Sequence, residues 1–230
     1  MNKVIETLLS HRSFRSYLEK DVDEDQLVQI IQAVQAAPSW INGQQVSVIA
    51  VKDVNRKQKL AELCGGQKHI EQAPVFLVFC ADFHRAYMSS QMEEQPLHVT
   101  DNIDTLLVGA TDVGIALGAA VTASESLGLG TVPIGGIRRN LNEVIEMLEL
   151  PPYVLPISGL CIGHPAETPQ LKPRLPKEAV YHSEVYNKED LHRMLEEYNA
   201  TFSNYLQNST QGKRSGTWTK AVANFYSKQY

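Results

Sequence analysis

The sequence predicts an α+β fold, because segments with the periodicity of helices and segments typical of strands share one chain of 230 residues. These segments do not alternate strictly as strand, helix and strand, which argues against a doubly wound parallel sheet. Hydrophobic residues make up 43% of the chain and charged residues 20%, which is typical of a globular protein that buries a real core.

The first half of the chain contains short helical and strand patterns separated by turn residues. Leu27, Ile30 and Val34 recur at helical spacing, Asp23 is a suitable N-cap, and Pro38 marks the end of that helix. The expected elements are helices at 2–10 and 24–37, a polar loop at 38–45, a strand at 46–51, a helix at 54–63 and a buried strand at 74–81.

The longest expected helix covers residues 101–127 and is apolar or small on nearly all sides, so we expect it to be central and buried. Asp104 and Asp112 within it argue against a membrane span. The remaining expected elements are a strand at 131–134, a helix at 140–148, a strand at 154–162, an extended arm at about 165–185 and helices within 188–228. Residues 1–230 are interpreted as a single domain.

Composition excludes several functional classes. The net charge of -5 and the pI of about 5.8 argue against nucleic-acid binding, which needs a basic surface. The three cysteines form no C-x-x-C pair and the N-terminus has no signal-peptide pattern, so we expect free thiols and a cytoplasmic protein. Motifs for serine hydrolases, zinc proteases and P-loop nucleotide binding are missing, and we expect no metal site.

Two basic segments are candidates for binding phosphate, because arginine forks and serine hydroxyls match phosphate oxygens. The first contains His11, Arg12, Ser13 and Arg15. The second places Lys172 and Arg174 around a proline, which stiffens the arm. Composition alone leaves a solvated helix end and a basic surface loop open as alternatives.

Two polar or glycine-rich segments are candidates for binding a heterocycle. Ile134, Gly135 and Gly136 follow a strand and would let a ligand lie against the backbone, although a tight turn explains them equally well. Their order differs from the dinucleotide fingerprint, which needs strand, glycines and then helix. The loop residues Ser39, Trp40, Asn42 and Gln44, together with Gln67, offer hydrogen-bonding groups that an ordinary turn would also contain.

In combination, these segments resemble the nitroreductase superfamily, and within it the bacterial NADPH-dependent nitroreductases and flavin reductases. The resemblance rests on the order and spacing of short motifs along nearly the whole chain. These are His11-Arg-Ser-Phe-Arg15, Gly65-Gly-Gln67, Val78-Phe-Cys-Ala-Asp82, Ile134-Gly-Gly-Ile-Arg138 and Lys172-Pro-Arg-Leu-Pro176. The resemblance implies a mixed, mostly antiparallel sheet surrounded by helices, and an intertwined homodimer with FMN at its interface.

The resemblance also implies roles for the candidate residues. His11, Arg12, Ser13 and Arg15 would hold the FMN phosphate and ribityl chain, and Lys172 and Arg174 would approach the phosphate and the pyrimidine edge. Gln67, Ile134, Gly135 and Gly136 would contact the flavin, and Ser39, Trp40, Asn42 and Gln44 would come from the partner subunit. Lys213 and Arg214 would meet the 2′-phosphate of NADPH.

The implied function is two-electron, ping-pong transfer from NADPH through FMN to nitroaromatics, quinones or similar small acceptors. The flavin would be the reactive centre, and no protein side chain is expected to act as a nucleophile. A reductase that supplies free reduced FMN, and a non-enzymatic flavin-binding module, remain open alternatives. A helical scaffold without a ligand would require the basic clusters to be incidental.

Overall fold

The computed structural model describes residues 1–228, and the chain divides into two compact units, Met1–Thr168 and Pro169–Tyr230. In the described residues, four strands form one sheet in the order β1-β2-β4-β3, with every neighbouring pair antiparallel. The strands are β1 (Val46–Val51), β2 (Val75–Asp82), β3 (Gly130–Ile134) and β4 (Val154–Gly163). The predicted α+β class and antiparallel sheet are confirmed.

Strand β2 lies inside the sheet between β1 and β4, and all its residues are buried. Its side chains alternate between two cores because successive residues of a strand point to opposite faces. Phe76, Val78 and Cys80 belong to one core, while Leu77 and Phe79 belong to the other. The continuous apolar run that predicted a buried strand at 74–81 therefore reflects a sheet that is covered on both sides.

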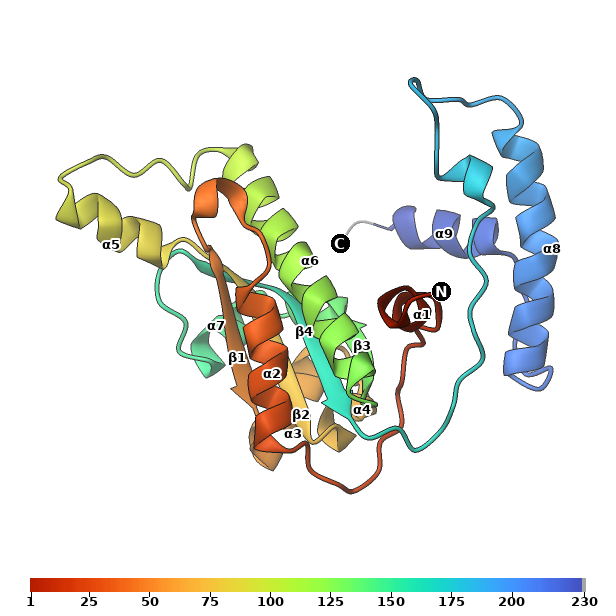
Figure 1. The fold of residues 1–230 in the computed structure, drawn as a ribbon, viewed down its shortest axis with the longest axis horizontal. Helices are drawn as coiled ribbons and strands as arrows, with labels where there is room; N and C mark the ends of the chain where they lie inside the picture. Colours follow the sequence, from red (N-terminus) through yellow and green to blue (C-terminus); the bar gives the residue numbers. More distant parts are fainter. Residues whose placement is uncertain (229–230) are drawn as a thin grey trace. The chain divides into compact units, whose positions relative to one another are not determined.

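Helices cover both faces of this sheet (Figure 1). One face packs against α2 (Glu24–Gln35) and α6 (Ile103–Ser126), and the other against α3 (Val54–Leu63), α4 (Lys68–Gln72) and α7 (Leu141–Met147). Helix α1 (Lys3–Leu9) contacts α6, and α5 (His84–Met92) extends away from the sheet in Figure 1. The helices α4 and α5 were not predicted.

Helix α6 packs in the core of the first unit with one face. Its buried face includes Val113, Ala116 and Ala120, but its other side exposes Leu107 and Ile115. The helix was predicted to be central and buried, and within this chain one of its faces is buried. It is long and apolar enough to cross a membrane by length and composition. Its packing against α2 and the sheet instead makes it a core helix of the first unit.

The second unit consists of an irregular arm followed by two helices, as predicted. The arm contains a short 3-10 turn, η3 (Lys177–Ala179), and leads to α8 (Leu191–Ser209) and α9 (Trp218–Tyr226). The side chain of Asn199 joins the helices, because it accepts a hydrogen bond from the backbone nitrogen of Thr219 at 3.0 Å. Ser203 donates from its hydroxyl to the Gly216 carbonyl oxygen at 2.7 Å, which fixes the turn between them.

Candidate functional site

The first basic segment lies alongside strand β3. Ser13 forms a parallel bridge with Thr131, and the backbone nitrogen of Phe14 donates to the Thr131 carbonyl oxygen at 2.9 Å. Phe14 also packs closely against Gly130, where a Cβ atom would come within 2.7 Å of the phenyl ring. The segment from His11 to Arg15 is thus held at the beginning of β3 by backbone pairing and by a close contact that needs a glycine.

The arginines of this segment provide donors that the protein does not fully use. Arg12 donates from Nη1 to the Ser10 carbonyl oxygen at 2.8 Å, while its Nε is buried and has no partner among the described residues. A buried donor without an acceptor is costly, and a ligand oxygen would satisfy it. Burial and the nearby Arg15 guanidinium lower the pKa of His69. Arg15 and the start of α4 are therefore neighbours.

His11 has a partner that was not predicted. Its Nδ1 lies 2.7 Å from Oε1 of Glu125, near the end of α6, and the same oxygen accepts a hydrogen bond from the Thr131 hydroxyl at 3.0 Å. The side chains of His11 and Glu125 are 27% and 10% exposed, respectively. One nitrogen of the imidazole, Nδ1, is therefore paired with a residue of the protein.

Gly136, just after β3, lies against the predicted flavin-binding Gln67. A Cβ atom on Gly136 would come 2.5 Å from the Cys64 carbonyl oxygen and 2.6 Å from Nε2 of Gln67. Gln67 itself donates to that carbonyl at 2.9 Å, which fixes its side chain. The structure thus brings Gln67 and Gly136 together. The ends of β3, Gly130 and Ile134, are about 13 Å apart, since four steps of roughly 3.3 Å separate them.

The loop containing Ser39, Trp40, Asn42 and Gln44 has an unusual backbone. Ile41, Asn42 and Gln44 have φ values of 50°, 55° and 50°, a backbone region that residues other than glycine rarely occupy. The loop also contains the short 3-10 turn η1 (Trp40–Asn42). Strain of this kind persists only where surrounding contacts hold it in place.

Those contacts come from α6 and α5. Both carboxylate oxygens of the buried Asp112 accept from the Trp40 backbone nitrogen at 3.2 Å. Arg85 donates to backbone carbonyl oxygens of Gln44 and Val46, and to the Asp82 carboxylate at 2.9 Å. The Trp40 side chain remains 63% exposed, so the loop presents it outward from a fixed base.

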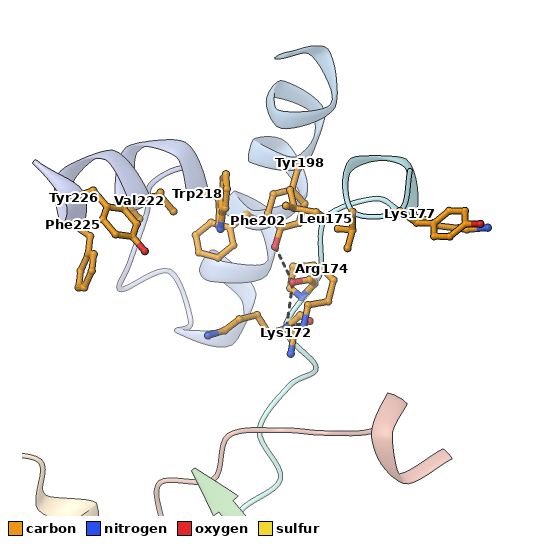
Figure 2. A pocket seen from close by; sticks show the side chains of 14 residues that line it. Lys172, Arg174, Leu175, Lys177, Tyr198, Phe202, Trp218, Val222, Phe225 and Tyr226 are labelled. Atoms are coloured by element: carbon orange, nitrogen blue, oxygen red, sulfur yellow. Dashed lines mark hydrogen bonds between the residues drawn. The ribbon is translucent and has the colours of Figure 1, made fainter. Parts of the chain in front are cut away.

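The second basic segment lies at one end of a cavity of about 900 Å³ within the second unit. Figure 2 shows Lys172 and Arg174 on the arm, below the rings of Tyr198, Phe202 and Trp218 from α8 and α9. The Tyr198 hydroxyl donates to the Pro173 carbonyl oxygen at 2.8 Å and so fixes the arm between the two cations. Burial raises the pKa of Tyr198, and the positive charge of Arg174 partly opposes that shift.

Lys213 and Arg214 lie in the turn between α8 and α9, where both are exposed. The Arg214 backbone nitrogen donates to the Thr210 hydroxyl at 3.0 Å, which anchors the turn to the end of α8. Neither cation lines the aromatic cavity. They form a separate basic group of the second unit.

The sequence did not predict the residues that hold the candidate binding segments in place. Glu125 and Asp112 are the clearest examples, because each secures a segment far away in the chain. A signal was present: both are acidic residues in an otherwise apolar helix. A carboxylate is rarely buried without a specific partner. The partner itself could not be read from neighbouring residues.

Comparisons with known proteins agree with this arrangement. The profile described as the nitroreductase family matches residues 8–164, and that of the nitroreductase family C-terminal domain matches residues 172–230. The FMN reductase (NAD(P)H) of Bacillus subtilis strain 168 is 53% identical over 232 residues, covering 100% of this chain and 93% of the relative.

Two further relatives cover nearly the same length. The oxygen-insensitive NADPH nitroreductase of Salmonella typhimurium is 40% identical over 222 residues, which are 96% of this chain and 90% of that protein. The solved structure of NfrA2 from B. megaterium is 50% identical with a TM-score of 0.97, and the match covers 100% of this chain and 93% of that one. The chain therefore belongs to the nitroreductase family.

Proposed function

We propose that this protein is an FMN-dependent oxidoreductase that passes two electrons from NADPH to nitroaromatics, quinones or similar small acceptors. The observation that carries the proposal is similarity along the whole chain to a relative named FMN reductase (NAD(P)H). The likeness to an NADPH nitroreductase supports the class of acceptor. Bound FMN would supply the hydride-accepting ring, and the protein would supply binding, orientation and charge.

The residues of the first unit fit such a ligand. Two arginines, one of them with an unpaired Nε (Arg12), and a serine hydroxyl form a donor set suited to a phosphate at the beginning of β3. At the other end of β3, Gln67 and the glycine backbone suit a flat ring with hydrogen-bonding edges. We therefore assign His11, Arg12, Ser13 and Arg15 to the phosphate end, and Gln67, Ile134, Gly135 and Gly136 to the ring end.

We assign the remaining candidates to the same cofactor. Lys172 and Arg174 would add positive charge at the phosphate and at the edge of the ring where the reduced flavin is negative. The rigid loop with Ser39, Trp40, Asn42 and Gln44 would reach the cofactor of a partner subunit. In this proposal residues 1–230 work as one FMN-dependent domain.

A cytoplasmic homodimer is part of the proposal. The exposed side of α6 contains Ile103, Leu106, Leu107 and Ile115, all between 40% and 77% exposed. A row of apolar side chains on a core helix supports burial against a second copy. Sedimentation equilibrium should give twice the chain mass of 25.6 kDa, and a monomer at micromolar concentration would contradict this assembly.

The absorbance spectrum of the purified protein tests the main proposal. We expect flavin bands near ~450 nm that bleach when NADPH is added without oxygen and return when a nitroaromatic or quinone is added. A protein that binds no FMN would refute the proposal, and one whose flavin NADPH does not reduce would be a binding module. Faster reoxidation by free FMN than by any other acceptor would favour the second candidate, an FMN reductase, which the name of the first relative supports.

Lys213 and Arg214 are proposed to select NADPH over NADH by pairing with the 2′-phosphate. The double variant Lys213→Ala/Arg214→Ala should raise KM for NADPH about tenfold or more and leave KM for NADH nearly unchanged. Steady-state kinetics with both nucleotides measures this directly. The variant Lys188→Ala, which removes an exposed cation before α8, is the control. An unchanged ratio between the two nucleotides would show that other residues select the phosphate.

A further inference from the structure

Glu125 occupies a position where a carboxylate is costly. Its side chain is 10% exposed, and it lies one residue before the end of α6, where the helix dipole is negative. Burial and the dipole both disfavour a negative charge there. Two short contacts offset this cost, from His11 Nδ1 at 2.7 Å and from the Thr131 hydroxyl at 3.0 Å.

Thr131 connects this carboxylate to the backbone of the first basic segment. It is fully buried, and its hydroxyl donates to Glu125 while its carbonyl oxygen accepts from the Phe14 backbone nitrogen. Ser13 pairs with the same residue through a parallel bridge. Hydrogen bonds therefore connect Glu125, Thr131 and the His11–Arg15 segment in one network at the start of β3.

The contact with Glu125 also determines the chemistry of the His11 ring. An ionised carboxylate only accepts hydrogen bonds, so Nδ1 of the imidazole must carry a hydrogen. The ring is thereby fixed in orientation, and Nε2 is the nitrogen that remains for an outside ligand. Carboxylates orient histidine side chains in the same way in metal sites, where losing the carboxylate weakens binding by the histidine.

We infer that Glu125 is a positioning residue for the cofactor phosphate: it fixes the His11 ring so that Nε2 contacts the phosphate, and Thr131 aligns the adjoining backbone. The inference rests on the proposed binding of FMN and adds a residue from α6 to that site. Glu125 does not touch the ligand. Its effect is confined to the phosphate and does not extend to the flavin ring.

FMN and riboflavin test the inference, because they share the ring and differ in the phosphate. The apo forms of the wild type, Glu125→Gln, Thr131→Val and His11→Ala are titrated with each ligand, and quenching of flavin fluorescence gives the dissociation constants. We expect Glu125→Gln to weaken FMN binding about tenfold and to leave riboflavin binding unchanged. Thr131→Val should also weaken FMN binding without changing riboflavin binding. Thr131→Ser, which keeps the hydroxyl, should bind FMN with wild-type affinity.

Two further measurements separate positioning from a general loss of structure. In the His11→Ala background, Glu125→Gln should have no further effect on FMN, because the residue through which it acts is gone. Nitrogen-15 spectra of the His11 ring should show hydrogen on Nδ1 in the wild type and a different distribution in Glu125→Gln. Glu143→Gln, an exposed carboxylate on α7, is the matched control and should change neither ligand.

The outcomes distinguish this inference from the proposed function. A wild-type protein that binds neither flavin refutes the proposed function itself. If the wild type binds FMN, the inference fails when Glu125→Gln weakens both flavins equally, when it weakens neither, or when its effect persists in the His11→Ala background. If Glu125→Gln does not fold, Thr131→Val and Thr131→Ser decide by the same ratio of FMN to riboflavin affinity.

Discussion

The two compact units of this chain bury their apolar side chains to very different degrees. In the first unit, every residue of β2 is buried and the sheet has a core on each face. Among the described residues of Pro169–Tyr230, Tyr198 alone is buried, and aromatic rings line an open cavity. A segment with so small a core cannot offset the entropy of ordering its backbone. Burial of apolar side chains within the unit therefore stabilises the first unit far more than the second.

The largest expected effect comes from the sheet core. Phe79 is fully buried in β2, and Phe79→Ala should lower the free energy of unfolding by about 3–5 kcal/mol through lost burial and a residual cavity. Guanidinium unfolding followed by circular dichroism measures the loss. The matched change Phe225→Ala, at a ring that is 50% exposed in the cavity, should cost less than about 1 kcal/mol. Equal losses of unfolding free energy in the two variants would contradict the difference in apolar burial between the two units.

Alkaline pH should act on the core that covers the opposite face of the same sheet. Burial, helped by the nearby charge of Asp82, raises the pKa of the Cys80 thiol from 9.0 to about 12. A raised pKa means that the native protein holds its proton longer than the unfolded chain. The resulting stability is complete below pH 9 and is lost as pH rises towards 12, by about 2 kcal/mol between pH 9 and 11.

The variant Cys80→Ala tests this assignment. Removing the thiol should flatten the fall of unfolding free energy between pH 9 and 11, whatever its effect at pH 7. Chemical denaturation at a series of pH values gives the slope. A slope identical to that of the wild type would mean that other groups, such as the buried Tyr17 hydroxyl, account for the alkaline loss.

The smallest expected effect lies in the second unit. Tyr198→Phe removes the hydrogen bond to the Pro173 carbonyl oxygen and should lower local stability by about 0.5–1.5 kcal/mol. Hydrogen exchange of the α8 and α9 amides resolves so small a change, because it reports local opening. Tyr205→Phe on the same helix is the control. An equal loss of protection at the β2 amides of the first unit would show that the two units unfold together.

The sequence predicted the elements of this fold better than their surroundings. The strand at 46–51 and the helix at 54–63 were placed correctly, because their patterns depend on local spacing. Helix α5 was missed, since its mixture of polar residues and methionines shows little periodicity. For α6 the composition predicted a central, buried helix, and within this chain one face of it is buried. Composition shows that the helix is apolar, but it does not show which segment or subunit packs against each face.

The candidate site divides in the same way. The residue types that suit a phosphate and a ring were recognisable from short motifs, and the structure brings Gln67 and Gly136 together as the assignment requires. The residues that hold these segments in place, Glu125 and Asp112, could not be recognised from short motifs. His11 and Glu125 are 114 positions apart, and Trp40 and Asp112 are 72 apart. Pairings over such distances depend on the folded topology, which no local pattern contains.

The close fit of Gly136 against Gln67 has a consequence for laboratory evolution of substrate range. Any side chain at position 136 would collide with the Cys64 carbonyl oxygen, which is backbone and cannot turn away. At the neighbouring Gly135, a Cβ atom would meet only the flexible end of Arg138, at an ordinary 3.5 Å. Variants at position 136 should therefore fail to fold, whereas variants at position 135 should fold and differ in how tightly they bind the proposed flavin ring.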